Sequence, residues 1–213
     1  MKTSNIIIIA YVVAILIGLT VLFSSSTKHV AEDRSPLSDS KGYGLPPITV
    51  VVALEKADVH IHQADFDSIH VEIEADSIDG RQFFHVSNDT LYAHSGARMY
   101  VKCKNPLSII GKNAYWIGLG QIKSDSIDLD ISGGQFHMNY DRLWSDIDQV
   151  SLKADSAQIT FRDAKIGQTE INASNKSMVD LSGEYDGIKV KLYNESDFHV
   201  DRNPKTLFLE RHD

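Results

Sequence analysis

The sequence predicts an all-β protein, a single-domain β-solenoid with coils of about 20 residues, preceded by one transmembrane helix. Three observations support this prediction. An apolar run stands near the N-terminus, apolar and polar residues alternate from Ile48 onward, and the alternation repeats at a fixed step in the C-terminal half.

The apolar run covers residues 6–23, IIIIAYVVAILIGLTVLF, and contains no charged residue. As a helix it is about 27 Å long, close to the roughly 30 Å hydrocarbon core of a bilayer. Cleaved signal peptides have shorter apolar regions, so we expect an uncleaved signal-anchor. The small residues Ser24, Ser25 and Ser26 keep cleavage as the alternative.

The composition along the chain indicates five segments. Residues 1–5 are a short cytoplasmic stub, 6–23 the transmembrane helix, 24–47 a Pro- and Gly-containing linker, 48–202 the solenoid domain and 203–213 a C-terminal tail. We therefore expect a single-pass membrane protein whose β domain is periplasmic or extracellular. The membrane is its first expected partner.

Strict alternation marks the strands of the domain. Val59 and Ile61, for example, alternate with Asp58, His60 and His62. Because successive side chains of a strand point to opposite faces, this pattern predicts strands with one buried face.

The C-terminal half repeats with steps of 19 or 20 residues. Three series share these steps: Leu152, Ile171 and Val190; Ile159, Val179 and Phe198; Asp155, Asn175 and Asn194. Coils this short bury their apolar faces only by stacking, and Asp or Asn suits the turns because it tolerates left-handed backbone. A β-sandwich is the alternative, but its turns need not align in register.

Several segments resemble a known family. They are Asp58–Gln63, Ile69–Glu74, Asp89–Ala93 and the tandem segments 154–161, 174–183 and 194–200. On these residues the chain resembles the "putative auto-transporter adhesin head" (GIN) domain family of exported Bacteroidetes proteins. The resemblance implies a β-helical fold, export, and an adhesive or surface role without a reaction.

Charge and motifs exclude several functions. The chain has 29 acidic and 21 basic residues and a formal charge of −8, without the basic cluster that nucleic acid requires. Cys103 is the only cysteine, so no internal disulfide forms and we expect a buried apolar role for it. Because no nucleophile elbow, P-loop or dinucleotide motif occurs, we predict no enzymatic activity and no cofactor.

Two groups of residues have a chemical interpretation and an ordinary one. His60, His62 and His70 have side chains of metal-ligand type, but exposed histidines on strands are common. We therefore predict no metal site.

The second group is acidic. Asp125, Asp128 and Asp130, with Arg142 nearby, resemble the grouped carboxylates of carbohydrate-active enzymes on β-helices. Strand alternation explains the same residues as a solvated face and a turn, and we favour that interpretation.

Aromatic residues gather in two segments that break the repeat, 105–120 and 139–148. Tyr115, Trp116, Tyr140 and Trp144 are the candidate binding residues, for a glycan or an envelope protein. The alternative is that these segments fold over the solenoid and cap its exposed edges.

Five positions share the form Asp-Ser/Thr-apolar, which resembles an O-glycosylation acceptor of exported Bacteroidetes proteins. The candidate acceptors are Ser68, Ser77, Thr90, Ser126 and Ser156. The same tripeptide is also a natural strand start after a turn.

The function predicted from the sequence is a non-enzymatic, membrane-anchored exported module for adhesion, carbohydrate contact or envelope scaffolding. Two alternatives stand beside it: a carbohydrate-active enzyme on a β-helix, and a membrane-bound accessory protein that senses envelope conditions.

Overall fold

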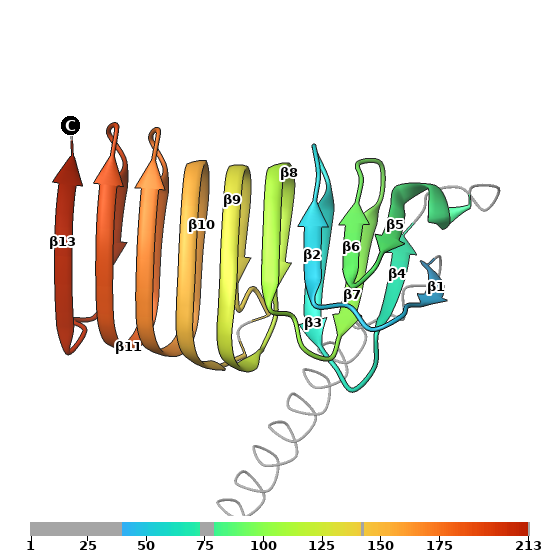
Figure 1. Ribbon diagram of the computed structural model, residues 1–213, viewed down its shortest axis with the longest axis horizontal. Coiled ribbons are helices and arrows are strands. Elements are labelled where there is room, and N and C mark those ends of the chain that lie inside the picture. The colour runs from blue at the N-terminus through green and yellow to red at the C-terminus, as the bar shows by residue number, and fades with distance from the viewer. Residues whose placement is uncertain (1–39, 73–78, 142, 213) are drawn as a thin grey trace, which may run out of the picture. The chain divides into compact units, whose positions relative to one another are not determined.

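The alternating segments fold into a parallel β-solenoid, in which each coil stacks on the next (Figure 1). The computed structural model describes residues 40–72, 79–141 and 143–212. Its strands are β1 (Ser40–Gly44), β2 (Val50–Ala53), β3 (Asp58–Gln63), β4 (Ser68–Glu72), β5 (Phe84–Ser87), β6 (Thr90–Ala93), β7 (Arg98–Cys103), β8 (Ser108–Leu119), β9 (Lys123–Met138), β10 (Ser145–Ser174), β11 (Met178–Tyr193), β12 (Asp197–Val200) and β13 (Thr206–His212), with one 3-10 helix, η1 (Gly80–Phe83).

Each coil has two long sides. Strands β2, β6 and β13 lie on the first side and β3, β7 and β12 on the second, whereas β8 to β11 bend at corners and contribute to both. The bending strands pair in parallel, each with the strand that follows it. Segments about one coil apart in the sequence therefore become neighbours in the sheet.

The strand register confirms the repeat in the C-terminal half. Val179 lies opposite Ile159 in β10 and opposite Phe198 in β12, so the series with steps of 20 and 19 forms one row. Ile171 lies opposite Val190 in the same way.

The Asp and Asn series forms a ladder of side chains at one corner. Asn175 Nδ2 donates to Asp155 Oδ1 at 2.6 Å, and Asn194 Nδ2 donates to Asn175 Oδ1 at 2.8 Å. Asn175 and Asn194 have φ values of 55° and 50°, in the left-handed region that Asn tolerates best after Gly. These residues thus both turn the chain and tie successive coils together.

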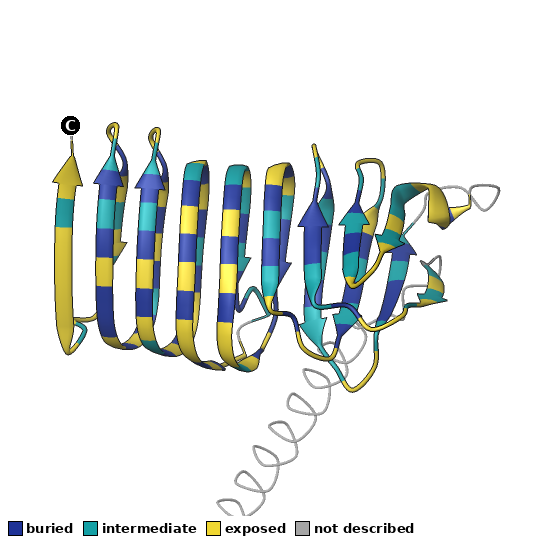
Figure 2. Ribbon diagram, in the orientation of Figure 1, coloured by how far each residue is buried: buried dark blue, intermediate teal, exposed yellow. Residues whose placement is uncertain are grey.

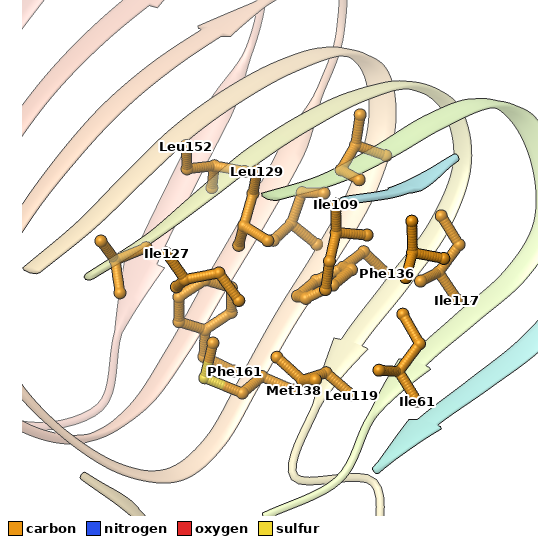
Figure 3. Packing of buried hydrophobic residues seen from close by; sticks show 14 of the residues in the cluster. Ile61, Ile109, Ile117, Leu119, Ile127, Leu129, Phe136, Met138, Leu152 and Phe161 are labelled. Carbon is orange, nitrogen blue, oxygen red and sulfur yellow. The ribbon is translucent and has the colours of Figure 1, made fainter. Parts of the chain in front are cut away.

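The core fills the space between the two sides. Figure 2 shows buried and exposed residues alternating along β8 to β11, as the sequence pattern predicted. Inside, Phe136 and Phe161 meet edge to face with ring centroids 6.0 Å apart, among Ile117, Leu119 and Met138 (Figure 3). Cys103 is also fully buried, as expected.

The coils of the N-terminal half are not stacked in chain order. β2 lies between β6 and β8, and β3 lies between β7 and β8. The coil formed by β6 and β7 therefore lies farther from β8 than the coil of β2 and β3 does, although β2 and β3 come first in the chain. Antiparallel strands cover this end, because β4 pairs with β7, β1 with β4 and β5 with β6.

Three expectations about segments were wrong. Residues 105–120 were expected to depart from the repeat, as a cap or a binding loop, but most of them form β8, a regular coil that pairs with β2 and β3 on one side and with β9 on the other. Residues 203–213 were expected to be a tail, but β13 pairs with β11 as the last strand. Part of the expected linker forms β1. In each case strand pairing stabilises a segment whose own alternation is weak.

The expected transmembrane helix, residues 6–23, lies outside the described residues. Within the described ranges, no helix is long and apolar enough to cross a bilayer.

The row through Val179 gives a direct test of the register. Val179 is fully buried and Asp180 beside it is exposed. We expect Val179→Asp to lower the free energy of unfolding by more than about 3 kcal/mol, because it buries an unpaired charge. Asp180→Ala should change it by about 0.5 kcal/mol or less. Urea unfolding followed by circular dichroism measures both, and equal effects would contradict the register.

Candidate functional site

The second side of the solenoid carries a row of aromatic and imidazole side chains. Alternation directs the even-numbered residues of β3 outward, and the parallel register aligns them with their neighbours. His60 lies opposite Tyr100 in β7 and Gly118 in β8, and Gly118 lies opposite His137 in β9.

Glycine makes room for rings on this surface. A Cβ atom on Gly118 would stand 2.7 Å from Cδ1 of Tyr140 and 2.9 Å from Nε1 of Trp116. Tyr140 follows β9 in the chain, so the segment after β9 brings its ring back over β8. Any larger residue at Gly118 would displace both rings.

The rings contact one another from several strands. The indole of Trp116 stacks on the imidazole of His137, with centroids 3.9 Å apart and planes 14° apart. His60 stacks on Tyr100 and meets Tyr140 edge-on, both at 5.0 Å. We call the resulting group the ring surface, and its members are His60, His62, Tyr100, Trp116, His137 and Tyr140.

Hydrogen bonds fix the ring surface at one edge. The Tyr140 hydroxyl and His62 Nε2 form a short hydrogen bond, and Nδ1 of His62 lies 3.9 Å from a carboxylate oxygen of Asp141. Burial lowers the pKa of His62, although the charge of Asp141 opposes this shift. Burial also raises the pKa of Tyr140. Both shifts favour the neutral form of each group at pH 7, in which the Tyr140 hydroxyl can donate to a ring nitrogen of His62.

An ionic group forms the other edge. Asp58 Oδ1 lies 3.0 Å from His60 Nε2, and Asp58 Oδ2 accepts from Arg98 Nε at 2.9 Å. Burial alone would raise the pKa of Asp58, but the hydrogen bonds from His60 and Arg98 lower it below its usual value. Arg98 is also 3.6 Å from Glu72 in β4. This network holds Asp58 ionised and fixes the His60 ring.

Two ring nitrogens of the surface have polar capacity left. Nε1 of Trp116 and Nδ1 of His60 are buried and have no hydrogen-bond partner among the described residues. Unpaired polar atoms at a buried position are unfavourable.

The structure divides the four predicted aromatic residues. Trp116 and Tyr140 belong to the ring surface. Tyr115 points elsewhere and is 68% exposed, beside a hollow that Gln135 and Met178 also line. Trp144 is 41% exposed, in the segment between β9 and β10. The register between β8 and β9 shifts between Ala114 and Ile117, so neither Tyr115 nor Trp116 enters the core and the two rings serve different surfaces.

The histidines weighed for a metal do not form a metal-ligating group. His60 and His62 belong to the ring surface, and His70 in β4 lies opposite Tyr100 and Gly42. In the parts of the chain that the structure describes, the residues of ligand type that converge are instead Asp180, His199 and Asp201, all three exposed.

The acidic residues weighed for catalysis lie on the first side or next to it. Asp125, Asp128 and Asp130 are exposed, and Asp130 lies 3.9 Å from Lys153. This is the solvated strand face that alternation predicted. Arg142 lies outside the described residues.

The candidate O-glycosylation positions differ in exposure. Ser126 and Ser156 are exposed, Thr90 is half-buried and Ser68 is 8% exposed. Ser77 lies outside the described residues. A transferase needs an accessible hydroxyl, so Ser126 and Ser156 are the positions that fit modification of the folded chain.

Two solved structures share this fold. A "putative adhesin" from Bacteroides fragilis NCTC 9343 matches with a TM-score of 0.57 and 8% identity, over 81% of this chain and 92% of that one. A "putative lipid binding protein" from Parabacteroides distasonis ATCC 8503 matches with a TM-score of 0.55 and 8% identity, over 82% and 96%. No family model and no curated protein matches the sequence. The resemblance to Bacteroidetes adhesins therefore extends to the fold.

Two partly buried histidines make stability depend on pH. Burial lowers the pKa of His62 and of His137, where Arg162 adds to the effect. In the unfolded chain these two histidines bind protons below about pH 6.5. In the folded chain they bind protons only at a lower pH. Stability from these two groups is thus complete above pH 6.5 and falls as the pH drops through their folded pKa values.

We expect the urea concentration at the unfolding midpoint to decrease as the pH is lowered from 7.5 to 5.5. The double variant His62→Gln, His137→Gln should show a smaller decrease. An unchanged slope in the double variant would contradict the assignment.

Proposed function

We propose that the protein is a membrane-anchored, exported contact module that binds a glycan or an envelope component through the ring surface and catalyses no reaction. The observation that supports this most is the assembly of six rings on one outward face, from four neighbouring strands (β3, β7, β8 and β9) and the segment after β9. Such a broad aromatic surface suits stacking of flat or ring-shaped ligands.

Carbohydrate is the ligand class that this surface fits best. The apolar faces of sugar rings stack on indole and phenol rings, while their hydroxyls need donors and acceptors at the edge. The half-exposed guanidinium of Arg98, paired with Asp58, offers charged donors beside the rings. The shared fold with a "putative adhesin" agrees with a contact role.

Export and anchoring complete the proposal. Residues 6–23 are long and apolar enough to hold the chain in a bilayer, and residues 24–39 connect them to the first strand. In this arrangement the N-terminus is cytoplasmic and the solenoid is periplasmic or extracellular.

The anchor is tested by extraction. We expect the protein to stay in the membrane fraction during an alkaline carbonate wash, because a transmembrane helix is not a peripheral contact. A soluble mature chain that begins near Ser26 or Thr27 would show instead that the segment is a cleaved signal.

The ring surface is tested with a matched pair of tryptophan variants of the full chain in detergent. On a glycan array, Trp116→Ala should weaken binding about tenfold or more, since a central aromatic carries much of an interface's energy. Trp144→Ala removes an equally large side chain outside the ring surface and should bind like the parent. Circular dichroism checks that both variants fold.

Equal losses in the two variants would contradict the location of the site. If the parent degrades a polysaccharide and Asp128→Asn eliminates this degradation, the proposal is overturned in favour of the enzyme.

A further inference from the structure

Four connections lie together along one edge of the solenoid, where the strands of its second side end. We call them the loop edge; they are residues 64–67 after β3, 104–107 after β7, 120–122 after β8 and 139–144 after β9. Figure 1 shows the first two at its lower edge. The backbone N–H of Lys104 donates to Asp67 Oδ1 at 3.2 Å, which joins the first two connections. Gln63 Nε2 donates to the Lys123 carbonyl at 3.0 Å, which joins them to the third.

The same hydrogen bonds occupy carboxylates of this edge. Asp141 accepts from the backbone N–H groups of Gln121 at 3.3 Å and Leu143 at 3.2 Å, so it also joins the third and fourth connections. Asp67 is engaged by Lys104 in the same way. These two carboxylates thus hold the loops together.

Large apolar side chains are exposed on the loop edge. Phe66 is 56% exposed, Leu107 41%, Leu143 51% and Trp144 41%. Further coils could not cover them, because they lie beside the stack and not at its end. Apolar side chains gathered on adjoining loops in this way mark a surface that contacts something else.

The lysines of this edge lack acidic partners. In residues 143–212 every lysine lies within 4.0 Å of a carboxylate. Lys102, Lys104 and Lys123 have no such partner among the described residues. Nζ of Lys102 instead lies 5.5 Å from the centroid of the Phe66 ring. Positive charge and exposed apolar surface therefore coincide here.

We propose that the loop edge rests on the anionic surface of the lipid bilayer, with Phe66, Leu143 and Trp144 at the boundary between head groups and acyl chains. The proposal rests on the membrane anchor proposed above. Tryptophan, phenylalanine and leucine beside lysine are typical of protein surfaces that lie in this boundary. Lysines near an anionic leaflet add electrostatic attraction.

The connection to the anchor keeps the edge within reach of the bilayer. Residues 24–39 stand between the apolar run and β1, and even a fully extended chain of that length spans only about 55 Å. The chain leaves β1 beside the loop edge, because the Leu45 N–H donates to the Asp67 carbonyl at 3.1 Å. Tethering raises the effective concentration of the bilayer at this edge, so weak contacts suffice.

Docking would also orient the ring surface. The segment after β9 contributes Tyr140 to the ring surface and Leu143 and Trp144 to the loop edge. With the edge on the bilayer, the strands of the second side run toward the membrane. The ring surface then faces sideways, toward ligands beside the protein in the same envelope.

The two tryptophans of the chain allow a direct test, because one lies on each surface. The full chain is reconstituted in vesicles of phosphatidylcholine and phosphatidylglycerol, with or without bromine on the acyl chains. Bromine quenches indole fluorescence only at short range. In Trp116→Phe, which keeps Trp144, brominated lipid should quench emission by about half or more, since an interfacial indole reaches the acyl boundary. In Trp144→Phe, which keeps Trp116, the loss should be at least about fivefold smaller.

Comparison of the parent with Trp144→Phe isolates the same signal if Trp116→Phe is unstable. Phe66→Ser and Phe208→Ser are a matched pair, since these rings are 56% and 54% exposed but Phe208 lies in β13. Phe66→Ser should reduce the quenching of Trp144, as should vesicles of phosphatidylcholine alone, whereas Phe208→Ser should not.

The proposal is overturned if Trp144 is not quenched, if both tryptophans are quenched equally, or if Phe208→Ser acts like Phe66→Ser. Carbonate extraction reports on the anchor separately. A chain that resists extraction while Trp144 stays unquenched retains the anchor and loses only the docked edge.

Discussion

Each coil of this solenoid buries its apolar side chains against the coils on either side, and every other feature depends on that stacking. A coil of about 20 residues has no interior of its own. Rows such as Ile159, Val179 and Phe198 are shielded from solvent by their neighbours only when the strands stay in register. The Asp155, Asn175 and Asn194 ladder keeps the corners in register with the strands. Core and corner therefore depend on the same period.

The two ends of the stack are built differently. At the end nearer β6 and β7, the antiparallel strands β1, β4 and β5 cover the parallel sheet. At the other end Leu207 and Leu209 continue the core rows of Ile188 and Val190 but are about half exposed, 49% and 51%. A change of strand direction is one way to end a parallel sheet, because it breaks the template for further coils.

The sequence predicted the C-terminal half better than the N-terminal half, and the reason is the stacking order. In the C-terminal half, the neighbouring coil in space is also the next coil in the chain. Paired residues there are 19 or 20 positions apart, so the repeat is visible in the sequence. His60 and Tyr100 are instead 40 residues apart, since β6 and β7 stand outside β2 and β3. In β8 the buried Gly111 and Gly118 interrupt the apolar alternation, which hid a regular coil.

The same order explains which site residues the sequence revealed. Trp116 and Tyr140 were recognisable as aromatic residues in irregular segments, but their companions His60, Tyr100 and His137 look like ordinary outward residues of separate strands. Only the register brings them together. Asp180, His199 and Asp201 escaped notice for the same reason, because they belong to two coils and share no motif.

The ring surface and the Asp180, His199 and Asp201 group lie along one row of the second side. From His137 the register continues to Thr160 of β10, then to Asp180 and His199. Neighbouring strands lie about 4.8 Å apart, so Asp180 is roughly 10 Å from His137. Thr160, small and uncharged, separates the rings from the carboxylates. Because no side chain is shared, a ligand confined to the rings need not contact the carboxylates.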